Sequence, residues 1–483
     1  MDSRIIAQFL GKIACIQGAV MVIPLVLAFI YDEEIQRVFM AAILFNLFLA
    51  GLLLSYGRKH IHTLNLREGM AITGLGWMTA TVLAMIPYVA SGALGPLDSL
   101  FESISGFTGT GATVITDIEA LPQSLLLWRS MTHWLGGLGI LVIFVALLPE
   151  SGQFWSTMYQ AEMTGPTRER ILPRLGVMTR VLFSMYMGAT ALAGMIFMAC
   201  GMDGLSAMNH ALSTVSAGGF STYNTSAAHF ENVSIEVWMT FFMVFTGGNF
   251  NLYYEIYKKG WTTVRQNTEF KTYVSILGVV TILITLNLVA AFPVEPLAAL
   301  RYSSFQVASI ATTGLVSADF DQWPSFSKML LLILMLMGGC AGSTAAGLKI
   351  SRIVILCKTL WALSHKILHP QMVLDVRMNG KPVSMVTIRQ VFQFFCLYMA
   401  FVFFWALLLV WDGVTIFDAF GISVSTMGCI GPAFGITGAT ETYAVLSDFS
   451  KAILCIAMLI GRLEIMTLLV MCKRDFWSSK SVW

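Results

Sequence analysis

Charged side chains are scarce in this sequence. They make up only 12% of the 483 residues, about half of the roughly 25% that is usual for soluble globular domains. Hydrophobic residues reach 57%, above the usual range of about 45–50%. This composition excludes a water-soluble multi-domain enzyme, and we expect a protein whose solvent is the lipid bilayer.

The sequence also lacks a large excess of charge of either sign. Lysine and arginine total 29 and aspartate and glutamate total 27, which leaves a formal net charge of +2. Nucleic acid is therefore not expected as a partner, because binding it requires a strongly basic surface.

Several chemical signatures are missing as well. The eight cysteines show neither CxxC spacing nor histidine neighbours, so we expect no zinc site and no disulfide framework, and interpret them as small buried hydrophobic residues. The sequence contains no Walker motif and no cluster of a nucleophile with a base. We therefore expect that this protein is not an enzyme.

What the sequence does have is a series of long apolar runs. A helix needs about 20 apolar residues to cross a hydrocarbon core of roughly 30 Å, and ten runs fit that requirement. They cover residues 10–30, 38–56, 70–90, 125–148, 176–200, 234–256, 272–292, 328–357, 388–411 and 450–472. The first is too long for a cleaved signal peptide. An even number of spans places both termini on the same side of the membrane.

The loops between these runs differ in charge. Loops that follow the even-numbered runs are basic, as at Arg58-Lys59 and Lys258-Lys259, whereas the alternate loops are acidic, as at Asp32-Glu33-Glu34. Because basic loops remain in the cytoplasm, both termini are predicted to be cytoplasmic.

Four of the predicted outer loops contain related segments. In each, a polar residue precedes a glycine by thirteen positions, and one apolar run lies before the segment and one after it. The pairs are Asp98 and Gly111, Ser206 and Gly219, Arg301 and Gly314, and Asp418 and Gly431. A unit of span, short helix, glycine loop and span is thus predicted to occur four times.

The short helix of each unit cannot cross the membrane. About ten helical residues at 1.5 Å each cover about 16 Å, half of the membrane, so the chain must turn back where its backbone is buried or lines a cavity. Four helix C-termini that meet near the midplane bring partial negative charge there, and glycine lets carbonyls point inward, as a potassium filter requires. Close helix packing is the alternative for any single loop, but four loops in one register favour a cation pore.

Six stretches of the sequence are distinctive. They are FESISGFTGTGAT from Phe101, WLGGLGILV from Trp134, AEMTGP from Ala161, HALSTVSAGGFST from His210, GGCAGSTAAGLK from Gly338 and GRLEIMTLL from Gly461. Together they resemble the Trk/Ktr/HKT superfamily of potassium transporters, and in particular the TrkH-type membrane subunit of bacterial Trk systems.

The resemblance implies an all-α integral membrane fold. Two N-terminal transmembrane helices would occupy residues 1–66, and four pseudo-symmetric pore repeats would occupy residues 67–150, 151–260, 261–360 and 361–483 around a single potassium path. It also implies a homodimer in the bacterial inner membrane, gated by a cytosolic TrkA-type nucleotide-binding subunit.

Carried over residue by residue, the resemblance identifies four filter segments whose backbone carbonyls would bind the transported K⁺. They are Gly109-Thr110-Gly111, Ala217-Gly218-Gly219, Thr312-Thr313-Gly314 and Cys429-Ile430-Gly431. Glycine at all four key positions implies a preference for potassium. The third segment departs from the family pattern because it looks one residue short, and the fourth because Gly428-Cys429 stands where asparagines are usual.

The eighth apolar run is interrupted by small residues at 338–347. In the family this position is an intramembrane gating loop below the filter, and such a composition favours unwinding. A small-residue packing face is the alternative. The gate residues on this run would be Gly338, Gly339, Gly342, Ser343, Thr344 and Gly347, and Arg462 of the tenth run would complete the gate.

Arg462 is the charged residue expected deepest in the tenth run, about 16 Å beyond Lys451. We expect it to line the cavity below the filter and to contact the gating loop, with an ion pair to an acid on another helix as the alternative. Arg129 and Lys328 are expected to extend toward the outer surface. His133 is interpreted as a hydrogen-bonded packing residue.

These features predict a channel-like protein through which K⁺ enters the cell, driven by the negative interior. The alternative is an alternating-access symporter for Na⁺ or K⁺ that is coupled to protons. A symporter of that kind predicts inverted repeats and midplane acids, whereas the units here run parallel and Glu464 is the single acid central to a predicted span.

Overall fold

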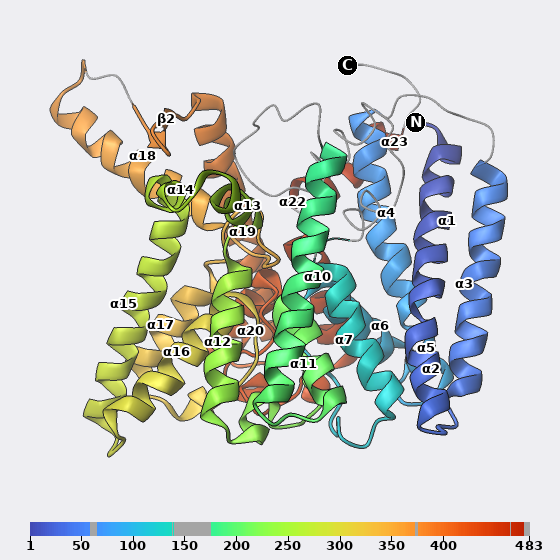
Figure 1. The fold of residues 1–483 in the computed structure, drawn as a ribbon. Coiled ribbons are helices and arrows are strands. Elements are labelled where there is room, and N and C mark those ends of the chain that lie inside the picture. The colour runs from blue at the N-terminus through green and yellow to red at the C-terminus, as the bar shows by residue number, and fades with distance from the viewer. Residues whose placement is uncertain (58–64, 138, 140–174, 372–374, 464, 478–483) are drawn as a thin grey trace.

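The apolar runs of the sequence form a bundle of helices (Figure 1). The structure is a computed structural model, and it describes residues 1–57, 65–137, 139, 175–371, 375–463 and 465–477. Within these ranges the strands are limited to one antiparallel pair, in which Arg377 lies opposite Pro382. The predicted all-α membrane fold is confirmed, while the four repeats and their boundaries stay a prediction.

The elements follow one another along the chain in this order. They are α1 (Ser3–Val20), α2 (Val22–Ile30), α3 (Gln36–Gly57), α4 (Leu66–Ala84), α5 (Ile86–Ala90), α6 (Pro96–Thr108), α7 (Gln123–Gly137), α10 (Leu175–Ala199), α11 (Gly204–Ser216), α12 (Val233–Gly247), α13 (Phe250–Lys259), α14 (Thr262–Gln266), α15 (Thr268–Ala291), α16 (Pro296–Thr312), α17 (Ser325–Met335), α18 (Ile350–Leu368), β1 (Arg377–Met378), β2 (Lys381–Pro382), α19 (Met385–Trp411), α20 (Ile416–Gly428), α21 (Asp448–Arg462), α22 (Ile465–Met471) and α23 (Arg474–Trp477).

Six apolar stretches of helix are long enough to cross a membrane in the described part of the chain. They are Ser3–Ile30, Gln36–Gly57, Arg67–Ala90, Thr179–Ala199, Thr268–Ala291 and Met385–Trp411. They match six of the ten predicted spans. The fourth predicted span is represented by α7, and its remainder lies outside the described residues, as do the AEMTGP motif, Arg58-Lys59 and Glu464.

Two predicted spans are not the continuous helices that their apolar content suggested. The span 234–256 divides into α12 and α13 at Gly248-Asn249, where Gly248 is extended and the Asn249 side chain accepts a hydrogen bond from the Asn251 amide. Glycine weakens a helix and asparagine is a good N-cap, so this dipeptide ends one helix and starts another. The tenth span bends by 114° between α21 and α22.

Four short helices lie inside the bundle and do not cross it. α6, α11 and α20 have 13 residues each and α16 has 17. Figure 1 shows them in the half of the bundle opposite the end where α1 begins. Each packs against two neighbouring helices: α6 against α7 and α21, α11 against α7 and α10, α16 against α12 and α15, and α20 against α19 and α21.

Both ends of the described chain lie at the same end of the bundle. The amide of Asp2 donates to Glu68 Oε1 (3.0 Å), and Arg67 Nη2 donates to the carbonyl of Phe476 (2.7 Å). The first residues, the start of α4 and the last described helix therefore meet, as an even number of spans requires. That this end faces the cytoplasm stays a prediction.

The cysteines are less buried than expected. All eight are free thiols, and the interpretation as buried residues holds for Cys340, Cys429 and Cys455. It is wrong for four exposed ones, Cys15, Cys357, Cys396 and Cys472. A weakly polar thiol on the outer face of an apolar helix is compatible with lipid contact, so position within an apolar run does not imply burial in the protein.

The first two spans are attached to the rest of the bundle by Glu33. Its carboxylate accepts hydrogen bonds from the amides of Gln123 (2.6 Å) and Ser124 (3.3 Å) at the start of α7. A carboxylate at this position satisfies free amides and complements the positive end of the helix.

Replacing Glu33 by alanine is expected to lower the free energy of unfolding by about 0.5–2 kcal/mol, the usual value of a helix cap. The measurement is the apparent melting temperature in detergent. Glu34→Ala is the matched control, because Glu34 is exposed. Equal melting temperatures for the two variants would contradict the role of Glu33 as a cap of α7.

Candidate cation-binding site

Three of the short helices end in the same way. The residue after α6, α11 and α20 adopts the left-handed conformation, with φ values of 71° at Gly109, 58° at Ala217 and 53° at Cys429. The next amide then reaches back over the helix end, as Thr110 does to the Ser105 carbonyl (3.0 Å). This hydrogen bond across six residues is that of a Schellman cap, and it turns the chain sharply.

The third loop turns differently. α16 continues through Thr312, and the amides of both Thr313 (2.6 Å) and Gly314 (2.9 Å) donate to the Ser309 carbonyl. Five positions separate Ser309 from Gly314, whereas six separate Ser105 from Gly111. The loop is therefore one residue shorter than the first loop, which fits the departure noted in the sequence.

The four key glycines form a closed ring with the neighbouring loops. Each adopts a positive φ, between 79° and 101°. A Cβ atom added to any of them would overlap a backbone oxygen of the next loop. The pairs are Gly111 with Gly218, Gly219 with Thr313, Gly314 with Ile430, and Gly431 with Thr110. The order runs from the first loop to the fourth and returns to the first, so the structure brings the four predicted filter segments together at one point.

The oxygens of this ring belong to the middle residues of the four segments. Among the hydrogen bonds between described residues, none involves the carbonyl of Thr110, Gly218, Thr313 or Ile430. Buried carbonyls normally have partners, so four such oxygens at one place suit a cation. The Gly431 carbonyl behaves differently, because it accepts from Ser425 Oγ (3.0 Å) and Tyr443 Oη (2.7 Å).

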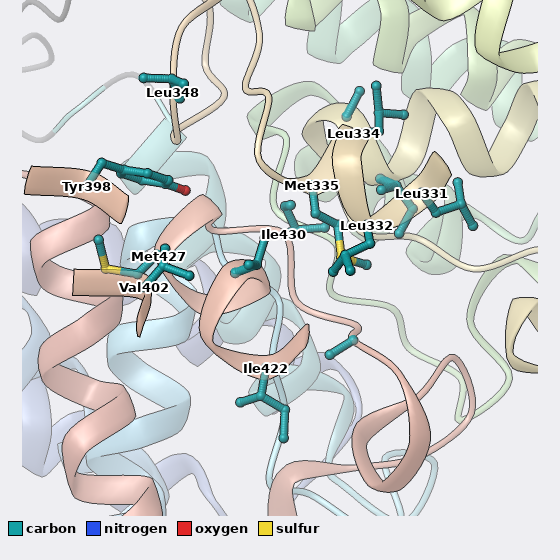
Figure 2. Packing of buried hydrophobic residues seen from close by; sticks show 14 of the residues in the cluster. Leu331, Leu332, Leu334, Met335, Leu348, Tyr398, Val402, Ile422, Met427 and Ile430 are labelled. Atoms are coloured by element: carbon teal, nitrogen blue, oxygen red, sulfur yellow. The ribbon is translucent and has the colours of Figure 1, made fainter. Parts of the chain in front are cut away.

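The middle residue of the fourth segment is also anchored in the hydrophobic core. The Ile430 side chain lies in the same buried cluster as Leu332 and Met335 of α17 and Met427 of α20 (Figure 2). Its backbone thus faces the ring while its side chain holds the loop from behind.

An acidic residue stands at the start of each short helix. Asp203 caps α11 and Glu295 precedes α16, while Asp98 and Asp418 lie in the first turns of α6 and α20. Burial opposes ionisation of Asp203, but hydrogen bonds from Ser206 and Leu205 lower the pKa of this carboxyl below its usual value. These acids stabilise the positive helix ends and leave the negative ends directed at the ring.

The predicted gating loop is not helical. α17 ends at Met335 and α18 begins at Ile350, and the segment between them contacts the end of α12 and the start of α13. The Cys340 amide donates to the Gly247 carbonyl (2.8 Å), and the Gly342 carbonyl accepts from the Phe250 amide (3.3 Å). All six proposed gate residues lie on this segment, so the interruption of the eighth span is observed.

Arg462 bridges this loop and the end of α7. Its Nη1 donates to the Thr344 carbonyl (2.9 Å), and its Nη2 donates to the carbonyls of Gly136 (2.5 Å) and Gly137 (3.0 Å). A cation at a helix C-terminus is favourable. The expected contact between Arg462 and the gating loop is confirmed, whereas its effect on ion passage stays a prediction.

Comparison with known proteins agrees with this geometry. Residues 35–481 match the TrkH family, described as cation transport proteins. The chain belongs to the TrkH family.

Members of the TrkH family resemble this chain from end to end. The Trk system potassium uptake protein TrkH of Halomonas elongata is 32% identical over 99% of this chain and 100% of its own length, and TrkG of Escherichia coli K12 is 33% identical over 99% of each. The crystal structure of the potassium transporter TrkH from Vibrio parahaemolyticus superimposes with a TM-score of 0.89 at 28% identity, covering 99% of this chain and 100% of that one. This is a family of transporters and not of enzymes.

The expectation for Arg129 was wrong. Its side chain is only 1% exposed and forms an ion pair of 2.8 Å with Glu102, which is fully buried. The partner lies 27 residues earlier on another helix, so neither periodicity nor loop charge revealed the pair; only the low frequency of buried charges hinted at a partner. Lys328 is half-buried, and its Nζ donates to the Asp321 carbonyl (2.8 Å).

Gly219→Ala is expected to reduce rubidium uptake into proteoliposomes at least about tenfold. The left-handed region costs about 1–2 kcal/mol for a residue with a Cβ, and here the added carbon also overlaps the Thr313 carbonyl. Gly188→Ala on α10 is the control, because a Cβ at Gly188 has no atom within 4 Å. Uptake by Gly219→Ala equal to that of the control would show that the close approach is unimportant.

Proposed function

We propose that this chain carries K⁺ into the bacterial cell across the inner membrane through the ring of filter segments. The observation that carries the proposal is the closed series of contacts from each key glycine to a backbone oxygen of the next loop. The names of the relatives, which are potassium uptake proteins, support potassium as the ion.

The ring has the chemistry that a dehydrated monovalent cation needs. Carbonyl oxygens replace the water around the ion, and the negative ends of four helices add to the favourable potential. K⁺ is the transported substrate here and would be held by the carbonyls of the four segments. The Gly431 carbonyl is engaged by Ser425 and Tyr443. The role of Gly431 is therefore to leave space, through its missing side chain, for the Thr110 carbonyl of the neighbouring loop.

The gate of the proposed pathway is the segment 338–347 together with Arg462. The guanidinium ties Thr344 to the end of α7, so the loop is held across the base of the filter. A TrkA-type nucleotide-binding partner, acting on a homodimer, would release it from the cytoplasmic side. Exposed basic residues at that end suit an acidic partner surface; they include Lys258, Lys259 and Arg265.

The alternative is a cation symporter, for Na⁺ or K⁺, that is coupled to protons. Such coupling requires a carboxylate that exchanges protons with the path. The described buried glutamates all have partners. Glu102 pairs with Arg129, and Glu236 pairs with Arg301. Glu68 accepts from the amides of Asp2 and Asn65, and Glu269 accepts from those of Ala341 and Ser351. These contacts favour the uncoupled pathway.

The function is tested by rubidium uptake into liposomes that contain the purified chain. We expect an outward potassium gradient, which makes the interior negative, to drive uptake. External K⁺, kept well below its internal concentration so that the gradient persists, should compete more strongly than Na⁺. A pH gradient alone should drive none. Accumulation driven by a pH gradient would favour the symporter, and no uptake under either gradient would contradict both.

Arg462→Gln is expected to raise basal rubidium uptake in the absence of the cytosolic partner, roughly fivefold or more, because hydrogen bonds to a charged group contribute about 1.5–3 kcal/mol. The control is Arg37→Gln, whose side chain is exposed at the start of α3 and lies outside the basic surface proposed for the partner. Basal uptake and its response to the partner with ATP are measured side by side. Unchanged values for Arg462→Gln would remove Arg462 from the gate.

A further inference from the structure

Two buried polar side chains of α7 face the backs of the first two filter segments. Arg129 and His133 are four residues apart and therefore lie on the same face of the helix. Both are shielded from solvent, and neither belongs to a filter segment or to the gating loop.

Arg129 connects the two stretches of loop that follow the first and second filter segments. Its Nη1 donates to the Ser221 carbonyl (3.0 Å), and its Nη2 approaches Thr113 Oγ1 (3.3 Å). Thr113 and Ser221 each stand two positions after a key glycine, Gly111 and Gly219. The guanidinium also lies 4.1 Å from the centre of the Phe220 ring.

Glu102 completes this link from the side of α6. One oxygen pairs with Arg129 (2.8 Å), and the other accepts from the Val114 amide (3.1 Å). Thr113 Oγ1 lies 3.1 Å from both carboxylate oxygens, and the Thr113 carbonyl accepts from the Tyr443 amide (2.8 Å). The network thus extends to Tyr443, whose hydroxyl holds the fourth segment at Gly431.

His133 fixes the stretch of loop that follows Gly219, at Phe220, one residue nearer to the ring than Ser221. Its Nε2 accepts a hydrogen bond from the Phe220 amide (3.2 Å), so Nδ1 carries the proton and donates to the Gly106 carbonyl (2.6 Å). A neutral ring of one tautomer satisfies both contacts. Phe220 directly follows Gly219, and a Cβ at Gly218 would overlap the imidazole.

The third and fourth segments are held by other means. Ser309 Oγ donates to the Leu315 carbonyl, and Ser425 Oγ donates to the carbonyls of Gly431 and Pro432. The equivalent hydroxyls of the first two loops, Ser105 and Ser213, have no hydrogen-bond partner among the described residues. The hydroxyl support is thus replaced at these two loops by charged and imidazole groups from α7 and α6.

We propose that Glu102, Arg129 and His133 are positioning residues that set the width of the ring at the first two segments, and thereby the discrimination between K⁺ and the smaller Na⁺. The proposal rests on the proposed function of the ring. These three buried side chains fix the stretches of loop after Gly111 and Gly219 from behind. The oxygens of Thr110 and Gly218 therefore keep a spacing that does not contract around a smaller ion.

Two conservative variants test this role. Arg129→Lys keeps the charge but loses the planar fork that reaches Ser221, Thr113 and Glu102 together, and Glu102→Gln keeps the shape without the charge. The readout is the ratio of Na⁺ to K⁺ concentrations that halve rubidium uptake into liposomes. We expect this ratio to fall at least about fivefold, which corresponds to the loss of one hydrogen bond of ordinary strength.

The control is the second Arg–Glu pair, through Arg301→Gln. Arg301 pairs with Glu236 (3.1 Å), is 26% exposed and lies over the Tyr302 ring. Neither of these contacts is to a filter segment or to the loop that follows one. The Arg301→Gln variant is expected to have a lower melting temperature, while its ratio of inhibitory Na⁺ to K⁺ concentrations stays unchanged.

His133 provides a second variant should the Arg129 and Glu102 changes prevent folding. His133→Gln retains a polar side chain but not the fixed pair of ring nitrogens, and the same fall in the ratio is expected. An unchanged ratio in folded, active variants overturns the inference while leaving the proposed function intact. Absence of selective rubidium uptake by the unaltered chain would instead overturn the proposed function.

Discussion

The close approach between each key glycine and a backbone oxygen of the next loop is the constraint on which the rest of the structure depends. A side chain at any of these positions would separate two loops, and because the contacts form a closed cycle, moving one loop displaces both neighbours. The positive φ of each glycine and the space it leaves are thus requirements of the same contact. Carbonyls without described partners then meet at the negative ends of four helices, which is an arrangement that suits a cation.

Such a ring needs rigid support, because loops of irregular backbone do not hold a spacing by themselves. The half-depth helices supply part of it, with acids at their positive ends and, in three loops, a left-handed residue that turns the chain. The Asp98–Lys451 ion pair (2.8 Å) joins α6 to α21. The remaining support differs between the halves of the ring: serine hydroxyls hold the third and fourth segments, whereas Arg129, Glu102 and His133 hold the first two. Four units that look alike in sequence are therefore not equivalent in how their backbone is fixed.

The sequence predicts those features that arise from local pattern. Long apolar runs predict the spans, and the glycines thirteen positions after a polar residue predict which loops meet. Small residues at 338–347 predict the unwound segment. The break at Gly248-Asn249 was missed because the apolar residues on both sides outweighed two helix-ending residues in a window of span length. Arg129 was placed at the surface because its partner lies on another helix, and the extension of α16 through Thr312 depends on the Ser309 carbonyl accepting two amides. The Arg129–Glu102 pair is a tertiary interaction, whereas the other two are local hydrogen bonds that a pattern of apolar residues does not register.

Helix α7 contacts both the proposed filter and the proposed gating loop. Near its middle, Arg129 and His133 hold the loops that follow the first two filter segments. At its end, Gly136 packs so closely on α6 that a Cβ there would overlap the Phe107 carbonyl, and the carbonyls of Gly136 and Gly137 accept from Arg462, which also holds Thr344. The same helix thus contacts the proposed filter through Arg129 and His133 and the proposed gating loop through Arg462.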